Sequence, residues 1–110
     1  MSVEQEKIID VIGVDKKTGD VILTISDHLN WEDETRHLLL LQEKINAYLA
    51  FIESEEMIGS YPDAKGRRPV ISIKAMHEPS TGALKFLAQV RDIIAGAGIS
   101  FRFEHTPLEG

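Results

Sequence analysis

Residues 21–52 read VILTISDHLNWEDETRHLLLLQEKINAYLAFI and join a β-branched strand to a long amphipathic helix. The run Val21–Ser26 is rich in Ile and Val, as is typical of a well-covered strand. Farther along, apolar residues recur every three or four positions, which predicts a helix. That apolar stripe consists of Leu38, Leu41, Ile45, Tyr48, Leu49 and Ile52. The stretch therefore predicts a strand that leads directly into a crossover helix.

The flanking residues extend this unit on both sides. Ile8–Val14 is a second β-branched run, and Gly19 in the polar stretch between the two runs predicts a hairpin. We place the N-cap of the first helix at Asn30. After the helix, Glu53–Pro69 contains two glycines and two prolines, so we expect little regular structure there.

The second half of the chain repeats the alternation of strand and helix. Val70–His77 reads as a strand, with Ile71 and Ile73 on one face. A second helix opens at Pro79, Ser80 and Thr81 and ends at Gly96 and Gly98, one of which we expect as the C-terminal cap. Ile99–His105 then alternates between apolar and polar residues, which predicts a strand with one solvated face.

The predicted order of elements is therefore ββαβαβ in a single domain of residues 1–110. An antiparallel hairpin comes first, and each later strand pair is separated by a helix, which favours parallel pairing through right-handed crossovers. We predict an α/β (α+β) fold with two layers: a mixed four-stranded sheet and two helices packed on one of its faces.

Composition excludes several classes of function. The chain has 110 residues, a formal net charge of -6 and no cysteine. The negative charge is unfavourable for binding a phosphate backbone, so we expect no nucleic acid partner. Without cysteine there is no thiol catalysis, thiolate metal site or disulfide. No apolar run approaches the roughly 20 residues of a membrane helix, and we expect a soluble, cytoplasmic protein.

Charge is distributed unevenly along the chain. Residues 1–62 contain thirteen acidic and five basic residues, a net charge of -8, whereas residues 63–110 have five acidic and seven basic residues, a net charge of +2. Ordinary variation between solvated faces accounts for this difference. Alternatively, opposite charges meet across a homo-oligomer interface, or the acidic half masks a basic partner, as an inhibitor or immunity-type protein would.

Over most of its length the sequence resembles a family of small bacterial proteins of unknown function. The resemblance is carried by residues 22–31, which end in Asp27-His28-Leu29-Asn30-Trp31, and by the leucine-rich residues 38–48. The loop at Tyr61-Pro62 and the strand that begins at Pro69 are also similar. The resemblance implies a bacterial, single-domain protein and supplies no activity or site residues.

Histidines follow the ends of three predicted strands. His28, His77 and His105 each lie at such an end, and Asp27 and Glu78 are next to two of them. Ligands of open α/β sheets bind at the carboxyl ends of strands. These five residues are our candidates for a ligand site, or for a site that holds a divalent metal through imidazole and carboxylate groups. The structural alternative is that polar residues simply belong at strand ends, and no tight ligand spacing such as HExxH supports a metal.

Two further sets of residues are candidates for binding. The apolar surface of the first helix is wider than packing on one sheet face requires, so we expect a contact surface there or on the far face of the sheet. Its candidate residues are Trp31, Leu38, Leu40, Leu41, Tyr48 and Phe51. Lys65, Arg67 and Arg68 form a basic loop that is either a solvated loop or an anion site.

The sequence thus favours a non-enzymatic interaction module that self-associates, most simply as a homodimer, and we expect no resident cofactor. The alternatives are a ligand-binding or metal-binding protein that uses the histidine edge, and the acidic inhibitor.

Overall fold

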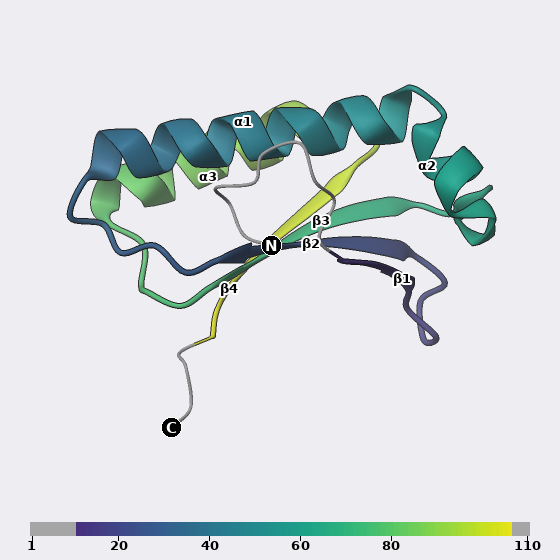
Figure 1. Cartoon of the computed structure of the whole chain (residues 1–110), viewed down its shortest axis with the longest axis horizontal. Helices are drawn as coiled ribbons and strands as arrows, with labels where there is room; N and C mark the ends of the chain where they lie inside the picture. The colour runs from purple at the N-terminus through teal and green to yellow at the C-terminus, as the bar shows by residue number, and fades with distance from the viewer. Residues whose placement is uncertain (1–10, 107–110) are drawn as a thin grey trace.

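The structure is a computed structural model that describes residues 11–106 of the chain. Figure 1 shows two layers, a twisted sheet below and helices above. In chain order the elements are β1 (Val11–Val14), β2 (Val21–Asp27), α1 (Glu34–Glu53), α2 (Glu56–Ser60), a 3-10 turn η1 (Pro62–Ala64), β3 (Pro69–Ala75), α3 (Thr81–Ala95) and β4 (Ser100–His105).

The four strands follow one another in the sheet in the order β1-β2-β3-β4. β1 pairs with β2 in antiparallel fashion, as the hairpin prediction requires. β2, β3 and β4 are parallel to one another. The two parallel connections contain α1 and α3, and both helices lie on the same face of the sheet (Figure 1). The predicted mixed sheet and the placement of the helices are confirmed.

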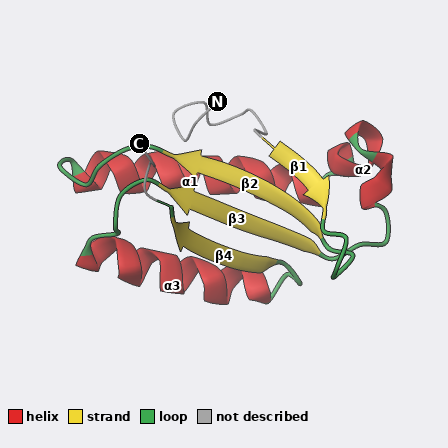
Figure 2. Cartoon of the chain, turned by 90° about the horizontal axis from the view of Figure 1, so that it is seen from below, coloured by secondary structure: helices red, strands yellow, loops and turns green. Residues whose placement is uncertain are grey.

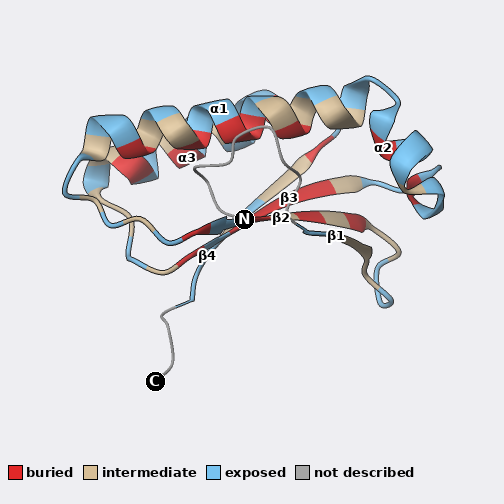
Figure 3. Ribbon diagram, viewed as in Figure 1, coloured by how far each residue is buried: buried red, intermediate tan, exposed pale blue. Residues whose placement is uncertain are grey.

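The core lies between the sheet and the two long helices, where buried residues are concentrated (Figure 3). Leu23 of β2, Ile71 of β3 and Phe101 of β4 lie opposite one another in the register and point toward the helices. From α1, Leu41 and Tyr48 are fully buried against them. The Tyr48 hydroxyl donates a 2.9 Å hydrogen bond to the Thr24 carbonyl oxygen, so the ring also ties α1 to β2.

On the opposite face of the sheet the predicted alternation is confirmed for β4, where Arg102 and Glu104 are exposed. The same alternation of buried and exposed side chains is less regular in β3. Ser72 is only 2% exposed and Val70 only 1%, although both lie on the face away from the helices. They lie on β3, which has β2 and β4 on either side of it in the sheet.

Two details of the prediction need correction, and a third is not tested. The segment between α1 and β3 contains the short helix α2 and the turn η1, so the fold has three α-helices among the described residues instead of two. Asn30 is not the N-cap of α1. The cap is Asp33, whose side chain accepts a hydrogen bond from the Arg36 N–H, while Asn30 Oδ1 accepts one from the Glu32 N–H. Finally, β1 begins at Val11, and the predicted strand residues Ile8–Asp10 lie outside the described residues.

The turn between β1 and β2 is held by an aspartate and by a residue with a left-handed backbone. Gly19 has a φ of 79°, as the turn prediction required. The carboxylate of Asp15 accepts hydrogen bonds from the backbone N–H groups of Lys17, at 2.8 Å, and Thr18, at 3.4 Å. These two bonds, with that of Lys17 the larger effect, lower the pKa of Asp15 below its ordinary value of 3.8.

This turn yields a prediction about stability in acid. An amide at position 15 accepts the same two hydrogen bonds without a charge, so Asp15→Asn should be less stable than the wild type at neutral pH. The pKa of Asp15 is lower in the folded state than in the unfolded state. Its contribution is therefore present above the unfolded value and lost as the pH falls through the folded value. Urea unfolding of both proteins from pH 7 downward should show the difference shrinking only below about pH 4. A difference that is unchanged at about pH 2.5 would contradict this account of the turn.

Candidate functional site

The carboxyl ends of β2, β3 and β4 lie along one edge of the sheet, which we call the carboxyl edge. Figure 2 shows the three arrowheads at this edge, with the starts of α1 and α3 next to them. Strand ends and helix N-termini are the usual position of a ligand in open α/β sheets. This edge therefore contains the candidate site.

The most buried polar pair in this region joins β2 to α1. Asp27 is the last residue of β2, and its side chain is 0% exposed. Its Oδ2 lies 2.6 Å from Nε2 of His37, whose side chain is 2% exposed. The second carboxylate oxygen, Oδ1, accepts a 3.1 Å hydrogen bond from the Leu29 N–H. Both oxygens of Asp27 are thus satisfied without water.

The hydrogen bonds of His37 define the protons that the ring carries. Nδ1 lies 3.0 Å from the carbonyl oxygen of Asn30, which can only accept a hydrogen bond, so Nδ1 carries a proton. The other ring nitrogen, Nε2, is hydrogen-bonded to the Asp27 carboxylate. Neither ring nitrogen remains available to take a proton from a substrate, as a general base must.

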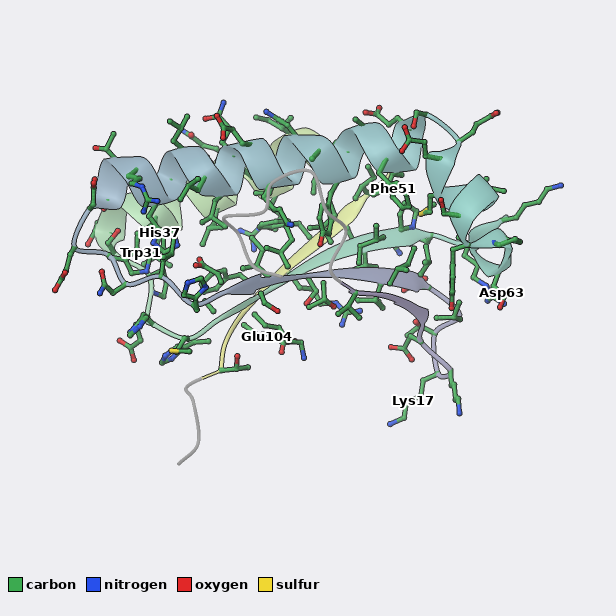
Figure 4. The ribbon with its side chains drawn as sticks, in the orientation of Figure 1. Lys17, Trp31, His37, Phe51, Asp63 and Glu104 are labelled. Atoms are coloured by element: carbon green, nitrogen blue, oxygen red, sulfur yellow. The ribbon has the colours of Figure 1, made fainter. Side chains whose placement is uncertain are left out.

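The single tryptophan covers this pair. The ring of Trp31 stacks on the ring of His37 with 3.6 Å between centroids and 19° between planes. Figure 4 shows the two labelled side chains next to each other below the first turns of α1. The indole Nε1 is buried without a hydrogen-bond partner. The stack therefore anchors the start of α1 to the end of β2 by apolar contact, and it seals His37 from solvent.

The N-terminus of α3 is also occupied by the protein itself. Ser80 caps this helix by accepting a 3.1 Å hydrogen bond from the Ala83 N–H. The Ser80 hydroxyl in turn donates to Oε1 of Glu34, which comes from the first turn of α1. A carboxylate near a helix N-terminus is stabilised by the helix dipole. Glu34 therefore stands where an anionic ligand of this edge would bind.

The five predicted ligand residues do not form one cluster. Asp27 is buried with His37, whereas His28, His77 and Glu78 are exposed. Glu78 Oε1 lies 4.0 Å from His105 Nδ1, and the other nitrogen of His105 lies 3.2 Å from the Met76 carbonyl oxygen. Within residues 11–106, no three His, Asp or Glu side chains are arranged to hold a metal ion. The strand ends meet as predicted, but Asp27 is bonded to His37, whereas His105 lies beside Glu78 and the Met76 carbonyl.

The predicted contact surface of α1 divides into two groups. Leu41 and Tyr48 are 0% exposed, so they belong to the core and are unavailable to a partner. The other four candidates are half-buried, namely Trp31, Leu38, Leu40 and Phe51. Leu39, which the sequence did not single out, is 52% exposed.

The three residues of the predicted basic loop differ in their contacts. Arg67 is committed to the fold, because its Nε donates to the Asp63 carbonyl at 2.7 Å and one terminal nitrogen donates to the Gly19 carbonyl at 2.9 Å. These bonds tie the β1–β2 turn to the segment before β3. Lys65 and Arg68 are exposed, and no side-chain partner is found for either within the described range.

His37 was not among the residues proposed for this site from the sequence, although its position in the first helix places it close to the same edge. It lies one helical turn before Leu41, in line with the apolar stripe of α1, and a polar residue on such a stripe signals a buried partner. Nothing local identified that partner as Asp27, which lies ten residues earlier.

Residues 1–107 match a family model described as a family of unknown function, DUF6572. No curated protein and no solved structure matches the chain with significance. Over residues 11–106, no helix combines the length and the apolar character that crossing a bilayer requires.

The buried pair predicts a coupled effect on stability. His37→Leu leaves the Asp27 carboxylate buried without its partner, which should lower the free energy of unfolding by about 3–5 kcal/mol. Adding Asp27→Asn removes the stranded charge but keeps an acceptor for the Leu29 N–H, so the double variant should regain most of the loss. Urea unfolding followed by far-UV circular dichroism measures all three proteins. Equal stability of the single and double variants would contradict the buried pair.

The contact between α1 and α3 predicts a second coupling. A Cβ at Gly82 would come within 2.7 Å of Glu34 Oε1, so Gly82→Ala should displace Glu34 from Ser80. In the wild type this loss should offset the gain in helix propensity, which is about 1 kcal/mol at most. In a Glu34→Ala background the same substitution should stabilise the protein. A double-mutant cycle in urea tests this, and an equal effect in both backgrounds would refute the contact.

Proposed function

The chain belongs to this family of unknown function, DUF6572, and we propose that it is a non-enzymatic interaction module that self-associates through the outer face of its two long helices. The chemistry of the carboxyl edge supports a non-enzymatic role. Its buried histidine has both ring nitrogens engaged, and Glu34 occupies the N-terminus of α3.

The observation that carries the proposal is an apolar groove between α1 and α3. It has a volume of about 200 Å³ and opens on the side of the helices that faces away from the sheet. Its lining residues are Gln42, Ile45, Asn46 and Leu49 from α1 and Phe86, Gln89, Val90, Ile93 and Ile94 from α3. Ile93 is 73% exposed at its rim. We call this surface the helix groove.

None of the residues that line the helix groove is charged, although 27% of the chain is charged. Depletion of charge around an apolar centre is the compositional signature of the core of a protein interface. A solvated helix surface would carry charged side chains at several of these positions. The composition of the groove therefore supports a role in binding protein.

The kind of polar residue in the groove favours a second copy as the occupant. In a two-fold dimer the same patch meets itself, so charges near the axis face like charges. Side-chain amides both donate and accept hydrogen bonds and can pair with their own kind. Gln42, Asn46 and Gln89 are such amides. A groove of apolar residues and amides is therefore self-complementary.

The size of the helical face is compatible with a dimer. α1 has 20 residues and α3 has 15, so they are about 30 Å and 22 Å long. A specific interface buries roughly 800 Å² on each partner, and two adjacent helices of these lengths offer a face of that order. The alternative of an acidic inhibitor depends on net charge alone and remains a prediction.

The proposal predicts that Ile93→Glu weakens self-association. This side chain is mostly exposed within one chain, so the substitution leaves the core intact. We expect the wild type to form a dimer in the micromolar range in sedimentation equilibrium. The dissociation constant of the variant dimer should be at least about tenfold higher, because a carboxylate would be buried at the centre of the contact.

Leu84→Glu is the matched control. Leu84 is also an exposed apolar residue of α3 and has the same size as Ile93. Its side chain is 55% exposed, but it does not line the helix groove. Its substitution should leave the dimer unchanged, and circular dichroism would verify that both variants are folded. A wild type that is monomeric at about 100 μM, or equal effects of the two substitutions, would refute the proposal.

A further inference from the structure

The outer edge of the sheet at β4 has unpaired backbone groups. Along β4, the N–H of Thr106 donates to the Ala75 carbonyl of β3, whereas the N–H of Ile99 turns away to the Ile94 carbonyl of α3. Because successive residues of a strand point their backbone groups to opposite sides, those of Phe101, Phe103 and His105 point away from β3. No strand pairs with this side of β4 in the described part of the chain. The edge therefore presents three N–H donors and three carbonyl acceptors.

A hollow lies above this edge. In Figure 2, which views the sheet from below, α3 lies outside β4, so it overhangs the position that a further strand would take. Between the two elements is a hollow of about 270 Å³. Its lining includes Leu84, Leu87 and Ala88 from α3 and Phe101 and Phe103 from β4. A strand added to β4 would direct alternate side chains into this apolar space.

A second hollow continues the first at the start of β4. It has a volume of about 490 Å³ and shares Arg91 and Phe101 with its neighbour. Arg68 also lines it, beside Ser100. Neither guanidinium has a hydrogen-bond or ion-pair partner among residues 11–106, although the chain contains 18 acidic and 12 basic residues. Two arginines without such a partner thus line the same hollow, and a guanidinium group readily binds a carboxylate.

From these observations we infer that the edge of β4 binds the C-terminal segment of a partner protein as an added antiparallel strand. β4 starts at Ser100, next to the two arginines, so an antiparallel segment ends there. Its terminal carboxylate binds Arg68 and Arg91, and its alternate apolar side chains fill the hollow beneath α3. Backbone hydrogen bonds to Phe101, Phe103 and His105 supply affinity that is independent of sequence, as in other cases of strand addition.

A second copy of the sheet is a poor occupant of this edge. Antiparallel pairing of β4 with β4 of another copy would continue the sheet with both helical layers on the same side. Each copy brings an α3 that overhangs the shared edge, so the two helices would compete for the same space (Figure 2). A lone extended segment brings no helix. This site is also separate from the helix groove, which lies on the other flank of α3, and it does not depend on self-association.

The experiment uses the full chain, immobilised, to select binding peptides from a displayed library. The library contains random nine-residue sequences with free C-termini. Enriched peptides are synthesised both as C-terminal acids and as C-terminal amides, and their binding is measured by fluorescence polarisation. We expect alternating apolar residues in the enriched sequences. The amides should bind at least about tenfold more weakly than the acids, because they lack the charge that the arginines hold.

Variants of the chain locate the site. Arg68→Gln and Arg91→Gln should each weaken binding of the acids about tenfold and leave binding of the amides unchanged. Leu84→Glu should abolish binding of both forms, and Lys85→Gln, at the next position of α3 but outside either hollow, should change nothing. Hydrogen exchange should show the peptide protecting the N–H groups of Phe101, Phe103 and His105.

Four results would overturn the inference. The first is a library that yields no enriched peptide. The second is equal binding of the acids and the amides. The third is equal binding of the acids to the wild type and to a variant that carries both Arg68→Gln and Arg91→Gln. The fourth is protection that maps outside β4. The Leu84→Glu variant that serves as a dimer control above keeps the two proposals distinguishable, since each can fail while the other holds.

Discussion

The parallel pairing of β2, β3 and β4 is the constraint on which the rest of the structure depends. Parallel neighbours cannot be joined by a tight turn, so each connection must cross the sheet, and a right-handed crossover carries its helix to the same face each time. α1 and α3 therefore share one face of the sheet. The same constraint gathers three strand ends and two helix N-termini at the carboxyl edge. It also leaves the outer side of the helices and the free edge of β4 without any element of the described chain to cover them.

At the carboxyl edge, polar side chains form hydrogen bonds with other groups of the same chain. A buried Asp–His pair resembles the pairs in which a carboxylate orients a catalytic imidazole, but there one ring nitrogen remains free for the substrate. Here the second nitrogen meets the Asn30 carbonyl, and Trp31 closes the remaining side. Glu34 fills the anion position of α3. Through burial and hydrogen bonding, these groups join β2 to the helices.

The sequence predicted those features that depend on local pattern. The strands follow from β-branched runs, the hairpin from Gly19, and the start of α3 from Pro79, Ser80 and Thr81, of which Ser80 is the N-cap in the structure. The start of α1 was predicted wrongly because Asn30 and Asp33 are both good caps. The docking of Trp31 on His37 is a tertiary contact, and only such a contact decides between the two caps.

Polar residues on the buried side of α1 were hidden from pattern reasoning for a similar reason. His37 and Lys44 are 2% and 0% exposed, and both continue the stripe of Leu41 and Tyr48. A helical wheel that counts only apolar residues leaves them out. The structure shows that long side chains with apolar portions complete the stripe: the Lys44 Nζ lies 5.5 Å from the centre of the Tyr48 ring. Helix α2 has only five residues, too few for a periodic pattern to reveal.

The composition of α3 is the strongest reason to look for partners on the surface instead of a ligand in the interior. Packing on the sheet uses a narrow stripe of this helix, in which Ala83, Leu87 and Ile94 are buried. Leu84 and Ile93 project from opposite flanks of that stripe, at 55% and 73% exposure. Burying apolar surface stabilises a protein by roughly 25 cal/mol for each Å² that is removed from water, and an exposed apolar side chain does not contribute this free energy. The fold buries only the smaller part of Ile93 and less than half of Leu84, and each of them lines a hollow of the surface.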